Sequence, residues 1–442
     1  MSNNFPPDFT KERPIALKGK GVYVYTDDGK KYLDGCCGAM TANLGHCLEE
    51  VVESMKKQLD EITFTHRGQF SNQGLERLCE RIAALSPKGL NRVSIVNSGS
   101  EATEMAVKLG RDYWNAAGKP RKTKVITRWP SYHGATLGAM SFSGFASRRK
   151  QYSEYLDECP RLETPFCHRC PYEKEYPGCD VFCARYLQTI INRLGSEVIS
   201  AVMCEPVTGA SGAGITPPDE YFPVLQSICA KNGVLLIFDE VITGFGRTGK
   251  MFACEHWGIV PDMIVFAKGA SSGYGPAAGV VISDGIYKQI AQNDEFYSLT
   301  GHTYGGNPLC AEGAAAVLDY IVKNSIPEAV ARKERYFKEK LRFLFEKHEI
   351  ITHVRGKGLL WGVELSKSKK TLEPFAQNEQ ITGRLTDIAF RNGLLIYPSQ
   401  GFIDGINGDS VLLSPPLVIT EPEMDEMSEI LDRSISELSK TL

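Results

Sequence analysis

Short apolar runs alternate with longer amphipathic stretches along most of this 442-residue chain. The apolar runs, bounded by turn-forming residues, predict strands at 92–96, 124–127, 199–204, 234–238, 263–267 and 278–282. Between them, apolar residues at helical spacing predict helices at 101–116 and 221–232. Because strands that alternate with helices form mostly parallel sheets covered on both faces, the pattern indicates an α/β fold.

The two ends of the chain have a different pattern. A chain of this length should divide into about two or three domains. Near the N-terminus, the tight-turn pair Asp28-Gly29 predicts a hairpin that joins 22–25 to 31–33. Helices are expected at 48–59, at about 327–348 and at 423–438, the last two in a smaller C-terminal α/β unit.

Composition narrows the class of protein. With 50 basic and 53 acidic residues, the net charge of −3 gives no reason to expect nucleic acid or an anionic membrane as a partner. No apolar run approaches the roughly 18 residues that a membrane helix requires, and the N-terminal residues lack the pattern of a signal peptide. The 13 cysteines are therefore expected to be reduced thiols, and the protein cytoplasmic.

Two of the predicted strands end in charged residues. Asp239 follows the strand at 234–238, and Lys268 follows the strand at 263–267. If both strands lie in one parallel sheet, the acid and the amine emerge at the same edge beside apolar walls. Charged residues at strand ends are usually solvated, but a lysine with little exposure has a lowered pKa and can act as an amine nucleophile. Asp239 and Lys268 are therefore candidate catalytic residues.

Gly99 and Ser100 lie where a predicted strand leads into a predicted helix. Small residues there leave backbone N–H groups free at a helix N-terminus, which is a ready site for an anion such as phosphate. An ordinary helix cap, made by Ser98 or Ser100, would explain the same residues. The two interpretations are about equally supported by the sequence.

Tyr132 and His133 follow the strand at 124–127. They could form a surface turn, or they could place an aromatic ring against a flat cofactor with the imidazole as its polar neighbour. The polar loop at 302–308 by itself predicts only a turn.

The spacing of Gly244, Gly246 and Gly249 fits a dinucleotide-binding fingerprint. That fingerprint opens a helix and precedes an acidic residue by about 20 positions, whereas here the following residues are poor helix formers and the acidic pair comes first. A glycine-rich active-site loop is the preferred interpretation, and a non-catalytic dinucleotide-binding protein is the alternative.

A cysteine cluster lies in an insertion at about 159–183. Cys167, Cys170, Cys179 and Cys183 have a spacing that would allow a tetrahedral zinc site, with Cys159 just upstream. The gap between the two pairs is shorter than in common zinc motifs. Buried free thiols are the preferred interpretation, and a bound metal is the alternative.

Taken together, these motifs resemble the class III (omega) aminotransferases, which are fold type I enzymes that depend on pyridoxal 5'-phosphate. The resemblance extends from the N-terminal hairpin to residues 415–420, and it is strongest at 97–102, 132–134, 205–207, 239–249, 261–262, 267–269 and 302–308. It implies a large domain at 75–320 that contains a mostly parallel seven-stranded sheet. It also implies a smaller α/β domain built from both termini, 1–74 and 321–442, with dimer contacts in 1–74.

The same resemblance implies a role for each candidate residue. Lys268 would carry pyridoxal phosphate as a Schiff base and, when released, move a proton between the substrate and cofactor carbons. Asp239 would face the pyridine nitrogen and keep it protonated. The other expected cofactor contacts are Val241 and Tyr132 on the two ring faces, Gly99 and Ser100 at the phosphate, His133 and Glu205, and Thr303 reaching the phosphate of the neighbouring subunit in a homodimer.

The sequence departs from the family pattern where the far end of the substrate should bind. Relatives that use 2-oxoglutarate keep an arginine near the residues matching 411–416, and amine–pyruvate relatives often carry one near 396–399, but this chain has none in either segment. Because a carboxylate buried without a partner is costly, a dicarboxylate acceptor is disfavoured and pyruvate is preferred. The cysteine-rich insertion resembles one in taurine–pyruvate-type relatives, which favours an omega-amino acid or amine as donor.

A racemase or epimerase of the same family is the alternative reaction. Such an enzyme would use the same cofactor residues. It would need no second keto acid, which suits the missing arginines.

Overall fold

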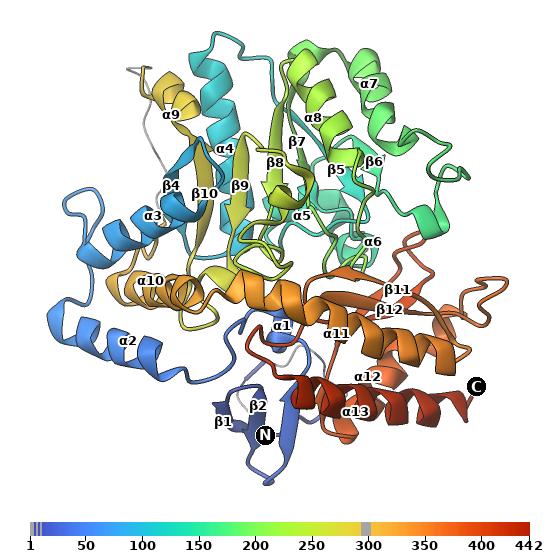
Figure 1. Ribbon diagram of the computed structural model, residues 1–442. Coiled ribbons are helices and arrows are strands. Elements are labelled where there is room, and N and C mark those ends of the chain that lie inside the picture. The colour runs from blue at the N-terminus through green and yellow to red at the C-terminus, as the bar shows by residue number, and fades with distance from the viewer. Residues whose placement is uncertain (1–3, 6–7, 9–10, 293–301) are drawn as a thin grey trace.

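A seven-stranded sheet forms the centre of the protein. The computed structural model describes residues 4–5, 8, 11–292 and 302–442 (Figure 1). In spatial order, the strands are β4 (Leu90–Val96), β10 (Ala278–Ser283), β9 (Met263–Phe266), β8 (Leu235–Asp239), β7 (Ile199–Cys204), β5 (Lys124–Trp129) and β6 (Arg161–Glu163). Only β10 runs antiparallel to its neighbours in this sheet. The α/β fold with a mostly parallel sheet is therefore confirmed.

Side chains of the central strands alternate between two apolar cores, one on each face of the sheet. On β8, Leu235 and Ile237 belong to the core that includes helix α4 (Gly99–Ala116). Leu236 and Phe238 face the other core, in which Phe238 lies 4.7 Å from the ring of Phe222 on helix α8 (Tyr221–Lys231). Burial on both faces explains why these strands read as nearly continuous apolar runs.

Helices surround this sheet and extend into the C-terminal part. They are α1 (Cys37–Met40), α2 (Glu49–Glu61), α3 (Gln73–Leu85), α5 (Leu137–Phe142), α6 (Ala146–Arg149), α7 (Phe182–Leu194), α9 (Asp284–Ala291), α10 (Pro308–Lys323), α11 (Ile326–Lys347), α12 (Ile381–Arg391) and α13 (Glu421–Ser439). The helices predicted from periodicity correspond to α2, α4, α8, α11 and α13. None of the helices in the described part of the chain combines the length and apolar character needed to cross a membrane.

Two smaller sheets complete the fold. One contains β11 (Ile351–Lys357), β12 (Leu360–Leu365), β15 (Asp409–Leu413) and β14 (Tyr397–Gln400), and the other contains β1 (Ala16–Lys20), β2 (Tyr23–Thr26), β3 (Lys31–Asp34) and β13 (Leu394–Leu395). The predicted hairpin is the antiparallel pair β2 and β3. Because β13 pairs with β3, an N-terminal and a C-terminal segment share a sheet, and Figure 1 shows β2 near the start of α13. The domain limits drawn from the sequence remain a prediction.

The glycine-rich segment 244–249 connects the central part of the chain with residues near both ends. It forms consecutive turns and opens no helix, so it lacks the geometry of a dinucleotide-binding loop. Within it, Arg247 is fully buried and donates hydrogen bonds to the carbonyl oxygens of Leu359 at 3.0 Å and Pro415 at 2.6 Å, and to Oδ1 of Asn43 at 2.7 Å. Its buried arginine ties separate parts of the chain together. The cavity described below is lined by Val241, Ile242 and Thr243, directly before this segment, so the interpretation of 244–249 as part of an active-site loop stays a prediction.

Candidate active site

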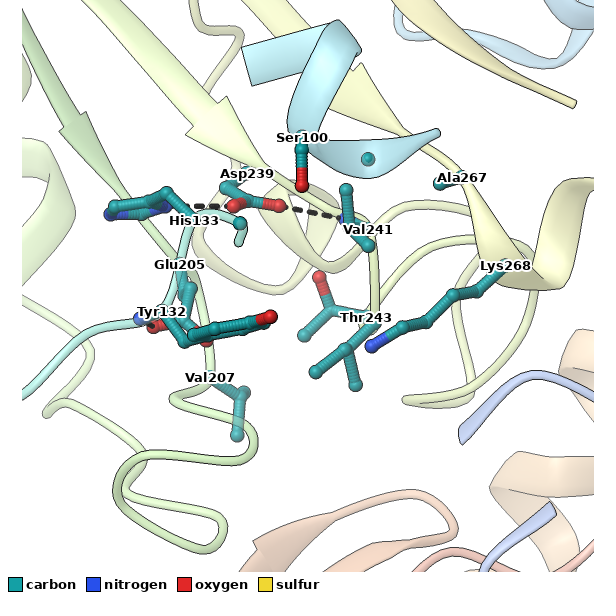
Figure 2. A pocket seen from close by; sticks show the side chains of 13 residues that line it. Ser100, Tyr132, His133, Glu205, Val207, Asp239, Val241, Thr243, Ala267 and Lys268 are labelled. Atoms are coloured by element: carbon teal, nitrogen blue, oxygen red, sulfur yellow. Dashed lines mark hydrogen bonds and ion pairs between the residues drawn. The ribbon is translucent and has the colours of Figure 1, made fainter. Parts of the chain in front are cut away.

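The carboxyl ends of β4, β5, β7, β8 and β9 converge on one cavity (Figure 2). This edge is where open α/β sheets bind their ligands. The residues that line the cavity are Gly99, Ser100, Tyr132, His133, Gly134, Glu205, Val207, Asp239, Val241, Ile242, Thr243, Ala267 and Lys268. Every expected site residue except Thr303 is among them. Thr303 is exposed and lies just after the residues 293–301, which are outside the described part of the chain.

Lys268 is the amine of this cavity. The strand expected to reach residue 267 ends at Phe266, and Lys268 begins a short turn with a φ of +41°, in the left-handed region that residues with a Cβ rarely adopt. Such strain is kept where the surrounding structure holds a side chain in a particular direction, and Figure 2 shows the amine pointing into the cavity.

The surroundings of Lys268 make its amine easier to deprotonate. Burial is the main reason that its pKa is lowered to about 8, because a buried site disfavours the charged form. The positive charge of Arg148 lowers the pKa further, whereas the negative charges of Asp239 and Glu205 raise it. About half of the Lys268 amines are therefore uncharged near pH 8, as a nucleophile or base must be.

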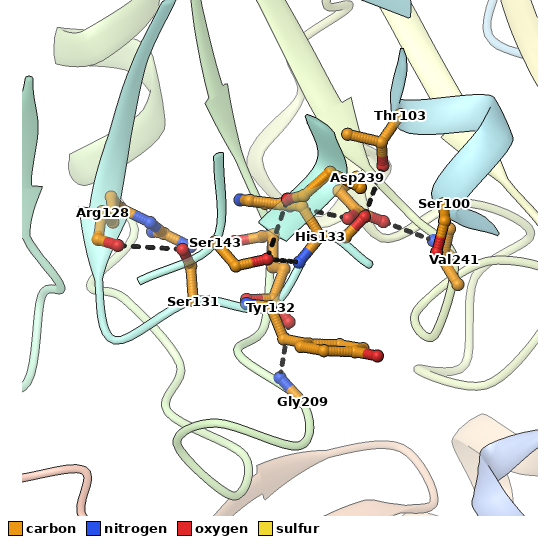
Figure 3. A network of polar contacts seen from close by, with 12 residues as sticks. Ser100, Thr103, Arg128, Ser131, Tyr132, His133, Ser143, Gly209, Asp239 and Val241 are labelled. Atoms are coloured by element: carbon orange, nitrogen blue, oxygen red, sulfur yellow. Dashed lines mark hydrogen bonds and ion pairs between the residues drawn. The ribbon is translucent and has the colours of Figure 1, made fainter. Parts of the chain in front are cut away.

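Asp239 is held in place by two hydrogen bonds at the end of β8 (Figure 3). Its Oδ2 lies 2.7 Å from Nδ1 of His133, and its Oδ1 accepts a hydrogen bond of 3.0 Å from the backbone N–H of Val241. His133 is fixed in turn, since its backbone N–H donates to Ser143 Oγ at 2.8 Å and its carbonyl oxygen accepts from Thr103 Oγ1 at 2.7 Å. The carboxylate thus enters the cavity in a fixed orientation.

Glu205 supports the loop that carries Tyr132. Its buried carboxylate accepts hydrogen bonds from the backbone N–H groups of Tyr132 at 3.1 Å and Gly209 at 3.0 Å. Burial raises the pKa of Glu205, with the charge of Asp239 acting in the same direction, while the His133 imidazole, the Gly209 N–H group and Arg128 lower it. The glutamate therefore positions an aromatic ring at the cavity wall.

The start of α4 is suited to an anion. Ser98, not Ser100, is the helix cap, because its side chain accepts the N–H of Glu101 at 3.2 Å. The N–H groups of Gly99 and Ser100, in the first turn, have no partner within the helix. Ser100 instead accepts a hydrogen bond of 3.0 Å from the N–H of Ala135. A helix N-terminus with free donors binds phosphate groups readily.

Glycine keeps this end of the cavity open. Gly134 has a φ of +142°, and a Cβ there would lie 2.6 Å from both Ser100 Oγ and Ala139 Cβ. A Cβ on Gly99 would lie 3.3 Å from Val241. Side chains at these positions would push Ser100 or Val241 out of place, so the glycines fit a site that must admit a ligand closely.

The cavity fits pyridoxal phosphate in its chemistry. Val241 and the ring of Tyr132 offer apolar surfaces that enter from different sides, and Asp239 offers an acid for the ring nitrogen (Figure 2). The N-terminus of α4 offers donors for a phosphate, and Lys268 offers an amine for an aldehyde. Nε2 of His133 is buried and has no hydrogen-bond partner among the described residues.

The cysteine cluster is separate from this cavity. Cys167, Cys170, Cys179 and Cys183 form no disulfide and line a small cavity of their own. The expectation that they are buried is wrong, because Cys167 is exposed and the other three are half-buried. In the described part of the chain, the only group of three potential metal ligands with donor atoms within 4.8 Å of one another is His168, His353 and Glu364. Both carboxylate oxygens of Glu364 already bind arginines, Arg169 and Arg355. The positive charges of these arginines disfavour a cation at that group.

Sequence reasoning missed some residues of the active site. Val207, Ile242 and Thr243 lie in loops directly after strand ends, and this position could have identified them. No sequence signal marks Arg148 as a site residue, because it lies on the short helix α6 and does not follow a strand end. Only the three-dimensional fold brings it against Tyr132.

Fold and site together define an enzyme with a buried amine and a fixed acid at the carboxyl edge of a parallel sheet. Residues 10–435 match the family described as aminotransferase class-III. The chain is 40% identical to the aminotransferase YodT of Bacillus subtilis, over 99% of this chain and 98% of that protein. It is 34% identical to a putrescine–pyruvate aminotransferase of Pseudomonas aeruginosa, over 93% and 88% of the two chains. An (S)-enantioselective omega-transaminase from Thermomicrobium roseum has the same fold, with a TM-score of 0.92, 31% identity and coverage of 99% and 96%.

This chain belongs to the class III aminotransferase family, and it is an enzyme of the transaminase type. Enzymes of this family depend on pyridoxal phosphate. Because the relatives are transaminases, the racemase alternative is not favoured.

Proposed function

We propose that this protein transfers an amino group from an omega-amino acid or amine to a small keto acid, with pyruvate preferred over 2-oxoglutarate. One observation carries most of the proposal. The fixed carboxylate of Asp239, the last residue of β8, and Lys268, which follows the neighbouring parallel strand β9, line the same cavity. An amine that can be uncharged near neutral pH and an acid held in one orientation are what transamination requires.

The residues proposed to hold the cofactor line the cavity, except for Thr303. Pyridoxal phosphate, when bound, withdraws electrons from the substrate carbon that gains or loses a proton. Asp239, oriented by His133, would pair with the ring nitrogen. The remaining proposed contacts are Val241 and Tyr132 on the ring faces, Gly99 and Ser100 at the phosphate, Glu205 behind Tyr132, and Thr303 from a second subunit.

Lys268 would have two successive tasks. Its neutral amine would first bind the cofactor aldehyde. After substrate displaces it, the same amine would carry the proton at the substrate carbon, because it lines the cavity and its pKa is lowered to about 8.

A homodimer with shared active sites would account for Thr303. This threonine is exposed in the single chain and lies outside the cavity. It belongs to the loop that, by resemblance to the family, reaches the phosphate of the neighbouring subunit. A dimer would bring it to the site it does not reach alone.

The preference for pyruvate is supported by two observations. Segments 396–399 and 411–416 have no arginine to bind a second carboxylate. A relative that covers most of the chain is named a putrescine–pyruvate aminotransferase. A single small carboxylate is therefore the better match for the acceptor.

The proposal is tested by a donor screen with two rival acceptors. Purified holoenzyme is given putrescine, taurine, β-alanine or 1-phenylethylamine, each with pyruvate or 2-oxoglutarate, and alanine and glutamate are measured. Alanine should form with at least one donor at about tenfold or more the rate of glutamate. Preferential formation of glutamate would overturn the pyruvate assignment. Change of chirality of a single amino acid with no keto acid present would overturn the transaminase assignment.

A further inference from the structure

Arg148 places a guanidinium group beside the cavity, in a chain that lacks the expected substrate-binding arginines. It belongs to helix α6, which helix α5 separates in sequence from the loop that carries Tyr132. Its guanidinium carbon lies 4.8 Å from the centre of the Tyr132 ring and 5.1 Å from that of Phe145. These cation–π contacts with two aromatic rings help to orient the guanidinium and use none of its N–H donors.

A third contact ties Arg148 to the C-terminal part of the chain. Its Nη2 donates a hydrogen bond of 3.1 Å to the hydroxyl of Tyr397, the first residue of β14. Tyr397 lies in segment 396–399, which contains no arginine of its own. Arg148 therefore brings a guanidinium to that segment from another part of the sequence.

The charge of Arg148 is available for a ligand. Within the described residues, no carboxylate oxygen lies within 4.0 Å of it, and its side chain is exposed. The adjacent Arg149 differs, because it is buried and its Nη1 donates to the carbonyl oxygens of Met140, Ser141 and Ser143. Arg149 supports the local backbone, whereas Arg148, among the described residues, donates its one side-chain hydrogen bond to the Tyr397 hydroxyl.

Arg148 also lies close enough to Lys268 to affect it. Burial is the main cause of the lowered pKa of Lys268, and the positive charge of Arg148 lowers it further. A substrate carboxylate bound at Arg148 would thus lie within electrostatic reach of the reactive amine.

We propose that Arg148 binds the carboxylate of the keto-acid acceptor, in place of the arginines missing from segments 396–399 and 411–416. The inference rests on the proposed transaminase function and names a residue for one part of it. Arginine presents two parallel N–H donors to a carboxylate, which gives both affinity and orientation. A single exposed guanidinium suits one carboxylate, which agrees with a monocarboxylate acceptor.

The test compares acceptors with and without a carboxylate. Arg148→Gln and Arg148→Lys holoenzymes are measured with pyruvate and with butanal, an uncharged carbonyl acceptor, using 1-phenylethylamine as a donor without a carboxylate. In Arg148→Gln, kcat/KM for pyruvate should fall by about tenfold to a hundredfold, while kcat/KM for butanal stays within about threefold. Arg148→Lys, which keeps the charge but not the fork, should restore part of the loss. Arg335→Gln, at an exposed position on α11, should change neither value.

A binding measurement separates this inference from the proposed function. Propionate has the carboxylate of pyruvate but no carbonyl group, and its dissociation constant can be followed through the absorbance of the bound cofactor. The dissociation constant of propionate should rise in Arg148→Gln by a factor similar to the fall in kcat/KM for pyruvate. Equal loss with pyruvate and butanal, or unchanged binding of propionate, would overturn the role of Arg148 and leave the transaminase assignment standing. Failure of the unaltered protein to transfer amino groups at all would overturn both.

Discussion

Nδ1 of His133 lies 2.7 Å from Oδ2 of Asp239, although 106 residues separate the two in the sequence. Because Asp239 also accepts the N–H of Val241, its carboxylate has little freedom to rotate. The imidazole is itself held through its backbone by Thr103 and Ser143. An acid that must meet one atom of a cofactor benefits from this support, since the orientation is fixed before the ligand arrives.

Removing the imidazole should therefore weaken cofactor binding. In His133→Ala, the Asp239 carboxylate loses a buried partner, and the affinity of apoprotein for pyridoxal phosphate should fall by about tenfold to a hundredfold. His133→Asn should lose less, because the asparagine amide can donate a hydrogen bond like that of Nδ1. Both affinities are measured by absorbance titration. An affinity unchanged in His133→Ala would show that the pair does not position the acid for this ligand.

The rate of covalent cofactor uptake should depend on pH with a midpoint near 8. Burial lowers the pKa of Lys268 to about 8, so the reactive neutral amine predominates above that pH and is lost below it. Stopped-flow absorbance of apoprotein mixed with pyridoxal phosphate should show a rate that falls about tenfold per pH unit below the midpoint and levels off above it. Arg148→Gln should move the midpoint upward, since it removes a charge that lowers this pKa. A rate that still rises steeply between pH 9 and pH 10 would contradict the lowered pKa.

Adding one methyl group at Gly134 should damage the anion end of the cavity. The Cβ of Gly134→Ala would lie 2.6 Å from Ser100 Oγ, at a φ of +142° that alanine rarely adopts. We expect a loss of about 1–3 kcal/mol in the free energy of unfolding, together with weaker binding of the cofactor phosphate. Gly118→Ala is the matched control, because Gly118 also has a positive φ but a Cβ there meets nothing within 4 Å. Equal effects of the two substitutions on cofactor binding would refute a specific role for Gly134.

Much of the fold could be predicted from local sequence pattern. The central strands are buried on both faces, so each forms an unbroken apolar run that is visible in the sequence. Strand β6 was missed because it has three residues and lies at the sheet edge, where little burial is required. The structural role of Arg247 in segment 244–249 could not be predicted, because its partners are Leu359 and Pro415, which no local pattern connects to it.

Some features of the active site could likewise be predicted from the sequence, and others could not. Asp239 and Lys268 were predictable because parallel strands bring their carboxyl ends to one edge. The pairing of His133 with Asp239 and the approach of Arg148 to Tyr132 depend on loop geometry, which sequence spacing does not specify. The position of Thr303 in an assembly depends on a second chain, so its role remains a prediction.

The identity of Lys268 as the cofactor-binding amine can be measured directly. Protein loaded with pyridoxal phosphate should be yellow, and reduction with borohydride should bleach it while fixing the cofactor covalently to one amine. Mass spectrometry of the digested protein should then find the label on Lys268. Lys268→Ala should retain the fold by circular dichroism but take up no label and lose transaminase activity by more than about a hundredfold. A label on another lysine, or a Lys268→Ala variant that still turns over, would contradict the account.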